Sequence, residues 1–167
     1  MKKTLAILCA ATLLVPSTAL AQHATLKTTL GQHFLIGAAL NTNVPDGNDP
    51  QSAELVKQQF NSIVAENCMK GERIHPEESV YNWTDADRLV QFGTENGMAV
   101  IGHCLIWHSQ APHWMFTDKD GKTVCKSVLI DRMYHHITTV VSRYKGRIKG
   151  WDVIMMVLSD LPLITKS

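Results

Sequence analysis

Four short apolar runs recur along the chain, and helically spaced apolar residues follow each of the first three. The predicted strands cover residues 34–40, 62–65, 99–106 and 148–154. Nearly continuous apolar strands that alternate with amphipathic helices are typical of a parallel sheet covered by helices, because each parallel pair needs a long crossover connection. The sequence therefore predicts an α/β fold made of consecutive β/α units.

The intervening helices are predicted from apolar periodicity and from end signals. One helix runs through residue 59 with Ser52 as its N-cap, and a second covers residues 85–96 between an N-cap at Thr84 and a C-cap at Gly97. A third covers residues 128–144 and stops before a glycine. No fourth helix is evident after the last predicted strand.

Polar side chains gather where the predicted strands end. Glu66 and Asn67 follow the second strand directly. Residues 102–114, after the third strand, hold three of the eight histidines, two of the four tryptophans and Gln110. Ligands of parallel α/β sheets bind beyond the carboxyl ends of the strands, so these residues predict a binding site. The alternative for residues 102–114 alone is a strand whose polar tip is merely solvated.

Residues 1–21 have the pattern of a secretory signal peptide. Lys2 and Lys3 precede a short apolar stretch, and Ala19-Leu20-Ala21 offers a small-x-small cleavage site. The apolar stretch is too short to span a bilayer comfortably. We therefore predict cleavage after Ala21 and a secreted or periplasmic protein.

The charge balance bears on the choice of partners, and the cysteine spacing bears on disulfide bonds and zinc sites. Residues 22–167 carry 14 basic and 15 acidic residues, which gives no reason to expect nucleic acid or a membrane as partner. Cys68, Cys104 and Cys125 have neither disulfide-framework nor zinc-ribbon spacing, so we predict that they are unpaired. The 146 residues after the cleavage site are enough for one domain.

Several kinds of chemistry lack their sequence signatures. No His-x-x-x-His or Cys-x-x-Cys pattern is present, Ser109 does not lie in a Gly-x-Ser-x-Gly elbow, and glycine-rich phosphate loops are missing. We predict no metal and no cofactor. The remaining amide, indole, imidazole, carboxylate and ammonium groups suit a neutral polyhydroxylated ligand. Glu66 beside Asn67 and Lys70 is better suited to binding a hydroxyl group than to catalysis.

These motifs resemble those of glycoside hydrolase family 10, the endo-1,4-β-xylanases, which are (β/α)₈ TIM barrels. Residues 60–70 are similar to the second-strand motif of that family, residues 102–114 to its third-strand motif, and residues 144–153 to the approach to its fourth strand. The resemblance implies that the chain supplies the first four β/α units of an incomplete barrel and interacts with xylan or xylo-oligosaccharides. It also implies a set of substrate contacts on the glycone side of the cleavage point, namely Glu66, Asn67, Lys70, His103, Trp107 and Gln110.

The resemblance ends close to the catalytic position. The family places Asn-Glu after its Trp-Asp-Val-Val motif, and that Glu is the general acid/base. Here Met156 occupies the position, and a thioether has no proton to give. The family's nucleophile comes from a later strand, beyond this sequence. We thus expect residues 22–160 to be the amino-terminal half of the catalytic domain, residues 161–167 to be a divergent tail, and hydrolysis to be weak or absent.

Half a barrel would leave two strand edges unpaired and one sheet face uncovered. A truncated or frame-damaged xylanase gene is the leading interpretation. One alternative is a non-catalytic xylan-binding protein that has kept its glycone contacts. Another is one half of a split enzyme, which a separate carboxy-terminal half would complete.

Overall fold

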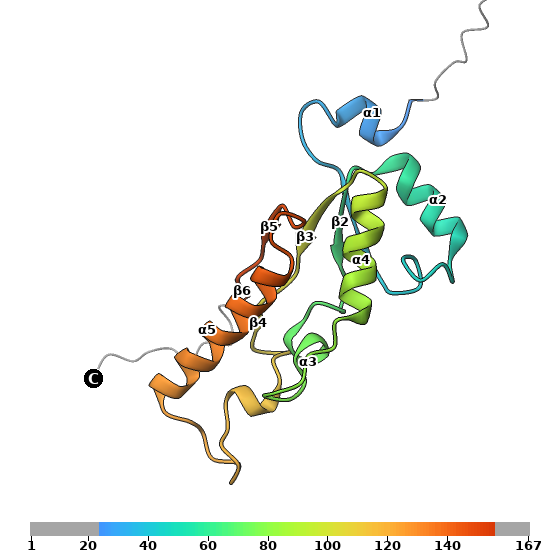
Figure 1. Cartoon of the computed structure of the whole chain (residues 1–167). Coiled ribbons are helices and arrows are strands. Elements are labelled where there is room, and N and C mark those ends of the chain that lie inside the picture. The colour runs from blue at the N-terminus through green and yellow to red at the C-terminus, as the bar shows by residue number, and fades with distance from the viewer. Residues whose placement is uncertain (1–23, 156–167) are drawn as a thin grey trace, which may run out of the picture.

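Four parallel strands form the main sheet of the computed structural model, which describes residues 24–155. The strands are β1 (Gly37–Leu40), β2 (Ser62–Ala65), β3 (Ala99–Gly102) and β5 (Gly150–Trp151), and they lie in the order β1-β2-β3-β5 (Figure 1). Ala39 aligns with Val64, and Val64 with Ile101. The predicted parallel sheet is confirmed. The predicted signal peptide, Met156 and the divergent tail lie outside the described residues.

Three longer helices connect these strands: α2 (Pro50–Gln59), α4 (Thr84–Glu95) and α5 (Lys126–Arg143). Short turns add α1 (Leu26–Leu30), α3 (Gly71–Ile74) and the 3₁₀ helix η1 (His113–Met115). The expected cap of α2 was wrong, because Asp49 is the N-cap and accepts a hydrogen bond from the Ser52 amide. Thr84 likewise begins α4 instead of capping it. Gly97 has φ +64° just after α4, which favours glycine at this helix end.

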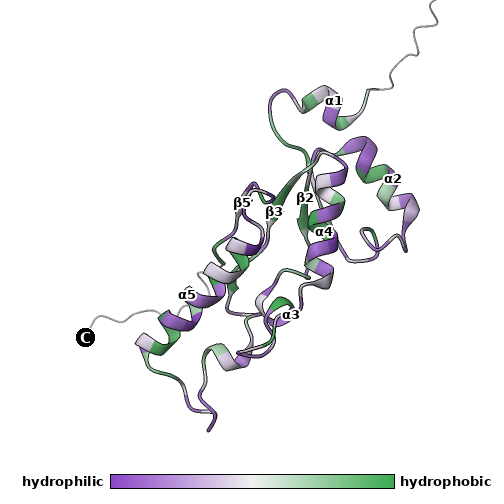
Figure 2. Ribbon diagram, in the orientation of Figure 1, coloured by the Kyte–Doolittle hydropathy of each residue, from purple (hydrophilic) through white to green (hydrophobic). Residues whose placement is uncertain are grey.

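The core lies between the sheet and α4. Ile63 and Val100 point from β2 and β3 toward Leu89 and Val90 of α4, and all four side chains are fully buried. The opposite face of the sheet is open, and Ala39, Val64 and Ile101 line a shallow depression there. Figure 2 shows that apolar residues concentrate on the strands and on the helix sides that face them. Within residues 24–155, no helix is long and apolar enough to cross a membrane.

The third and fourth predicted strands are each divided into two short strands, and the two breaks lie beside each other in the structure. After β3, the chain forms β4 (Ile106–Trp107), and after β5 it forms β6 (Ile154–Met155), and these two short strands pair in parallel. Gly102 aligns with Trp151, and Ile106 aligns with Ile154. The segment from β3 to β4 therefore contains one residue more than the segment from β5 to β6. Such a one-residue offset is the property of a β-bulge, which redirects side chains. The expectation of a continuous strand over residues 99–106 was therefore wrong.

Gly102 allows β3 and β5 to approach each other. A methyl group at this position would overlap the indole ring of Trp151. We expect Gly102→Ala to lower the free energy of unfolding by about 3 kcal/mol, the upper part of the usual range for overpacking, because β5 has only two residues with which to adjust. Urea unfolding followed by circular dichroism measures this difference in the free energy of unfolding between the variant and the unaltered chain.

Gly150→Ala is the matched control for Gly102→Ala, because a methyl group at Gly150 meets nothing within 4 Å. Its expected loss of stability is much smaller. Equal unfolding midpoints for the two variants would contradict the close packing of Trp151 on β3.

Candidate functional site

Four of the six predicted substrate contacts form one cluster, in which three side chains surround the ammonium group of Lys70. Lys70 precedes α3, and its side chain is buried, with a relative exposure of 8%. Its Nζ donates to Asn67 Oδ1 (2.9 Å) and to Gln110 Oε1 (2.6 Å), and it lies 4.7 Å from the centre of the Trp107 ring. The segments after β2 and after β4 thereby meet at a single cation.

The Lys70 ammonium is held by neutral groups. No carboxylate in the described part of the chain forms an ion pair with it, and its partners are two amide oxygens and an aromatic face. An ammonium has three N–H donors, of which the amide oxygens use two. A third hydrogen bond is therefore available to a ligand oxygen.

Gln110 is fixed from two sides. Its Nε2 donates to Glu72 Oε1 (3.0 Å), while its backbone oxygen accepts from the Glu72 amide (2.9 Å). These bonds orient the amide so that its oxygen faces Lys70. Sequence reasoning missed Glu72, although its place two residues after Lys70, in the same strand-end segment, was the available signal.

His103 is oriented by a carboxylate from the neighbouring strand. It lies at the offset between β3 and β4, and its Nδ1 is 2.9 Å from Asp152 Oδ2. Because a carboxylate only accepts hydrogen bonds, Nδ1 must donate, and Nε2 of the neutral ring is left as an acceptor. Asp152 was not predicted as a site residue, but it follows β5 at the same edge of the sheet as His103.

Glu66 stands apart from the Lys70 cluster. It follows β2 directly, and its amide donates to the Leu40 oxygen at the end of β1 (2.9 Å). Its side chain is exposed and forms no hydrogen bond or ion pair with any residue in the range 24–155. The structure therefore places Glu66 at the predicted edge, with a carboxylate that is free to accept hydrogen bonds from a ligand.

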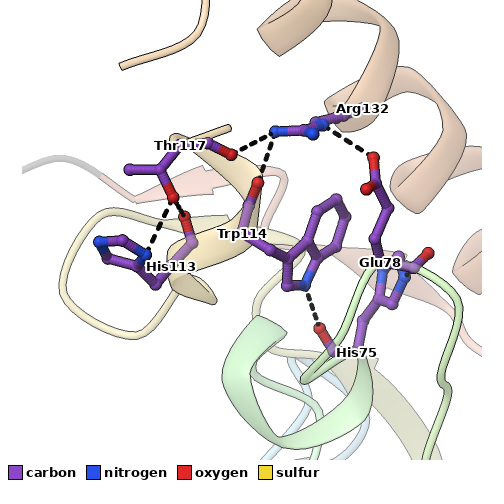
Figure 3. Close-up of polar contacts among 6 residues, drawn as sticks. All are labelled: His75, Glu78, His113, Trp114, Thr117 and Arg132. Carbon is purple, nitrogen blue, oxygen red and sulfur yellow. Dashed lines mark hydrogen bonds and ion pairs between the residues drawn. The ribbon is translucent and has the colours of Figure 1, made fainter. Parts of the chain in front are cut away.

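The loop after β4 is anchored to α5 by a polar network (Figure 3). Arg132 of α5 donates to the backbone oxygens of Trp114 and Thr117 and pairs with Glu78 (2.9 Å). Trp114 Nε1 in turn donates to the His75 oxygen (3.0 Å). Trp114 thus fastens the loop to α5 through its backbone oxygen and to the end of α3 through its indole N–H.

The arrangement is suited to binding hydroxyl groups without a metal. Among the described residues, no group of three or more His, Cys, Asp or Glu side chains could hold a metal ion. Cys68, Cys104 and Cys125 are free thiols, as predicted, and burial raises the pKa of Cys68 to about 12, which keeps it protonated. The strand ends together offer an ammonium donor against an indole ring at Lys70 and Trp107, an imidazole acceptor at His103 and a carboxylate acceptor at Glu66, in keeping with a neutral polyhydroxylated ligand.

Comparison with known proteins supports one family. The sequence profile described as "Glycosyl hydrolase family 10" matches residues 25–166. Endo-1,4-beta-xylanase A of Xylanibacter ruminicola is 58% identical over 153 residues, which are 91% of this chain and 42% of that protein. Endo-1,4-beta-xylanase C of Paenibacillus barcinonensis is 46% identical over 133 residues, which are 78% of this chain and 12% of that protein.

Solved structures agree with the sequence comparison. A family 10 structure from Paenibacillus barcinonensis has a TM-score of 0.73 and 45% identity, with 77% of this chain and 37% of that chain covered. Xylanase B from Clostridium stercorarium F9 has a TM-score of 0.74 and 39% identity, with 83% and 43% covered. The chain thus spans less than half the length of each relative. These structures are TIM barrels. They confirm the predicted fold class, in which the chain supplies the first strands and helices of an incomplete (β/α)₈ barrel.

Proposed function

The chain belongs to glycosyl hydrolase family 10, and on that premise we propose that it carries the glycone-side half of a xylan-binding groove. The single observation that supports this proposal best is the cluster of Lys70, Asn67, Gln110 and Trp107 at the carboxyl ends of the parallel strands. The relatives named above are xylanases, so the proposed ligand is xylan or a xylo-oligosaccharide. Residues 22–160 are proposed to belong to the catalytic domain of an exported protein, with residues 1–21 as its signal peptide.

Each predicted contact has a defined part in this proposal. Lys70 donates its remaining hydrogen bond to a sugar hydroxyl, while Glu66 and His103 Nε2 accept from hydroxyls. The amides of Asn67 and Gln110 hold Lys70 in place and contribute their own polar edges. Trp107 provides the aromatic surface against which the apolar face of a xylose ring packs. The two charges that the groove offers, at Lys70 and Glu66, are of opposite sign, which suits a ligand without net charge.

We expect Lys70→Met to weaken the binding of xylotriose by about 10- to 100-fold, because a charged hydrogen bond contributes roughly 1.5–3 kcal/mol. Trp107→Ala should weaken binding to a similar degree. Isothermal titration calorimetry on the full chain measures both. Lys149→Met, at an exposed lysine outside the cluster, is the matched control and should bind as the unaltered chain does. Absence of binding by the unaltered, folded chain would refute the proposed function.

We further propose that the chain as written binds xylan without cleaving it efficiently. The family's general acid/base position holds Met156, and the nucleophile is expected from a strand that follows the four described ones. A purely xylan-binding role and a hydrolase of low activity therefore share the same binding residues and differ only in turnover.

One half of a split enzyme is the second candidate, and two observations favour it. The open face of the sheet is lined by apolar side chains such as Val64 and Ile101, an arrangement that further strands of a barrel would cover. The buried Trp107 Nε1–H has no acceptor within residues 24–155. A complementing half would cover the open face with further barrel strands and could supply an acceptor for this N–H.

A further inference from the structure

The two outer strands of the main sheet each have an unpaired edge. Among residues 24–155, β1 pairs only with β2 and β5 pairs only with β3, while β6 continues the edge of β5 and pairs only with β4. Edge strands are usually protected by charged residues, by proline or by a covering segment. The sequence of β1 is Gly-Ala-Ala-Leu, which contains neither a charge nor a proline. Both edges are therefore open to pairing with a further strand.

Large apolar side chains are exposed beside both edges. Phe34 and Leu35 precede β1, whereas Val153 and Ile154 follow β5, and their relative exposures lie between 48% and 56%. Leu35 also lines the shallow depression on the open face of the sheet. Exposed apolar residues at unpaired strand edges favour association with another chain. Because the two edges differ in their residues, a contact that joins one to the other is heterologous.

The geometry of a barrel determines how many copies such a contact can join. A (β/α)₈ barrel has eight strands, and the main sheet supplies four neighbouring parallel ones, which is half of the circumference. Heterologous contacts form a closed ring when their rotation closes and an open filament when it does not. A rotation of about 180° about the barrel axis closes with two copies and keeps all eight strands parallel.

The strand register specifies which residues would meet in this contact. Four residues are aligned across the main sheet, namely Ala39, Val64, Ile101 and Gly150. In an eight-stranded barrel with a shear of about 8, the aligned positions are displaced by about four residues over half of the circumference. With the usual tilt of barrel strands, the displacement is toward the amino end of β1. Leu35 of a second copy then lies beside Gly150, and its Ala39 lies beside Ile154.

The residues that would meet are complementary in size. A Cβ atom at Gly150 would have no other atom within 4 Å, so the space beside this glycine is open to the side chain of Leu35. Ala39 has a small side chain and leaves space for Ile154 in the same way. Small barrels are filled by side chains that alternate in size at facing positions. The two edges of this chain therefore match each other in shape as well as in their free backbone groups.

We propose that two copies of this chain close one eight-stranded barrel, in which β1 of each copy pairs in parallel with the β5–β6 edge of the other. The two contacts are equivalent, and together they enclose the open faces of both sheets. All strands end at the same mouth, so the Lys70 clusters of both copies lie around it. The dimer goes beyond the proposed function, because its formation requires no sugar.

Light scattering coupled to size-exclusion chromatography tests the dimer on the full chain, after circular dichroism has verified that each variant is folded. The unaltered chain should have twice the mass of one chain at micromolar concentration. Leu35→Glu and Ile154→Lys should each raise the dissociation constant of the dimer at least about 100-fold, because each variant buries an unpaired charge in both contacts. Both variants should therefore be monomeric.

Leu55→Glu and Ile130→Lys are the matched controls. Both side chains are exposed to a similar extent as Leu35 and Ile154, but they lie on α2 and α5 instead of on a sheet edge. The two control variants should remain dimeric. Loss of the dimer in both controls would contradict an interface made by the strand edges.

An equimolar mixture of Leu35→Glu and Ile154→Lys distinguishes pairing between unlike edges from any other mode of association. In a mixed dimer, one of the two contacts is unaltered, and the other contains two introduced charges of opposite sign. The mixture should therefore form a dimer although each variant alone does not. A folded monomer of the unaltered chain would leave the edges to a separate carboxy-terminal half and would overturn the proposal. Oligomers of indefinite size, dimers of both edge variants, or a mixture that stays monomeric would overturn it as well.

Discussion

The chain with its natural Met156 should release no measurable reducing sugar from xylan. Retaining glycoside hydrolysis uses two carboxyl groups, one to attack the sugar and one to protonate the leaving group. The thioether of methionine can do neither. Loss of general acid catalysis costs on the order of 10²–10⁴-fold in rate. A reducing-sugar assay and an aryl xylobioside assay measure the expected lack of turnover.

The contribution of position 156 can be separated from that of the nucleophile. We propose to supply the remaining strands in trans, from the carboxy-terminal part of the Xylanibacter ruminicola xylanase, which is 58% identical in the matched region. With this partner, Met156→Glu should raise the rate on xylan by about 10²–10⁴-fold. A dinitrophenyl xylobioside needs no proton donor for its leaving group. The Met156 form should therefore release a burst of about one equivalent of the phenol and then turn over slowly.

Three results would separate the competing interpretations. Equal rates on xylan for the Met156 and Met156→Glu forms would show that another group donates the proton. Full activity of the Met156 form with its partner would favour a natural split enzyme. No activity of either form, together with intact xylotriose binding, would leave the non-catalytic xylan-binding protein as the better description.

The parallel sheet and the position of the site could be predicted from the sequence because both depend on short-range patterns. Residues 62–65 are apolar and are followed at once by Glu66 and Asn67, and the structure places β2 at Ser62–Ala65. Lys70 and Gln110 lie 40 residues apart, yet both follow predicted strands of one parallel sheet, and they meet as expected. The location of a site at the carboxyl ends of the strands is a property of the whole sheet. Its prediction therefore required no detailed knowledge of side chains.

The offset between β3 and β4 could not be predicted, because it depends on pairing between distant segments. Residues 99–106 read as one apolar run, and nothing local in that run indicates where the register with residues 150–155 changes by one residue. Asp152 orients His103 at this offset, so its role was hidden for the same reason. The predictions of the helix caps were wrong for a different reason. Ser52 and Asp49 are both good capping residues, and only the backbone conformation decides between them.

Two fully buried histidines join α5 to the segment after α3. His75 Nδ1 and His136 Nδ1 are 2.9 Å apart, and each Nε2 lies 3.1 Å from a backbone oxygen, of Glu78 and Leu105 respectively. A carbonyl oxygen only accepts, so both Nε2 atoms must carry protons, and two neutral rings then have no proton left for the contact between the Nδ1 atoms. A third proton would complete that hydrogen bond but would place a positive charge in a fully buried site.

The energetic comparison favours the neutral pair. A charged hydrogen bond contributes roughly 1.5–3 kcal/mol, whereas burying an ion costs several kcal/mol. Burial accordingly lowers the pKa of His75 and lowers that of His136 to about 4. The charged groups that act on the pair are His135, which lowers both pKa values, and Glu78, which raises that of His75. Tyr81 and Trp114 cover the rings and contribute no opposite charge.

Acidification should therefore destabilise the fold between pH 6.5 and about 4. In this window the unfolded chain binds protons at these histidines and the folded chain does not, so the free energy of unfolding falls as the pH falls. The shift of His136 corresponds to a loss of about 3 kcal/mol across the window. Asp87 has a lowered pKa because of its hydrogen bond from Arg143, so its own contribution is lost only at still lower pH. Urea titrations at a series of pH values measure the slope.

His136→Gln distinguishes the pair from other acid-sensitive groups. Glutamine can still donate to the Leu105 oxygen but does not titrate, so this variant should be less stable at pH 7 and should lose much less stability between pH 6.5 and 4. His135→Gln, at the adjacent exposed position of α5, is the matched control and should keep most of the slope. If His136→Gln retained the full pH dependence of the unaltered chain, the acid sensitivity would have to arise outside the buried pair. A reduced slope would show that two neutral imidazoles hold the junction between α5 and the segments that carry His75 and Leu105.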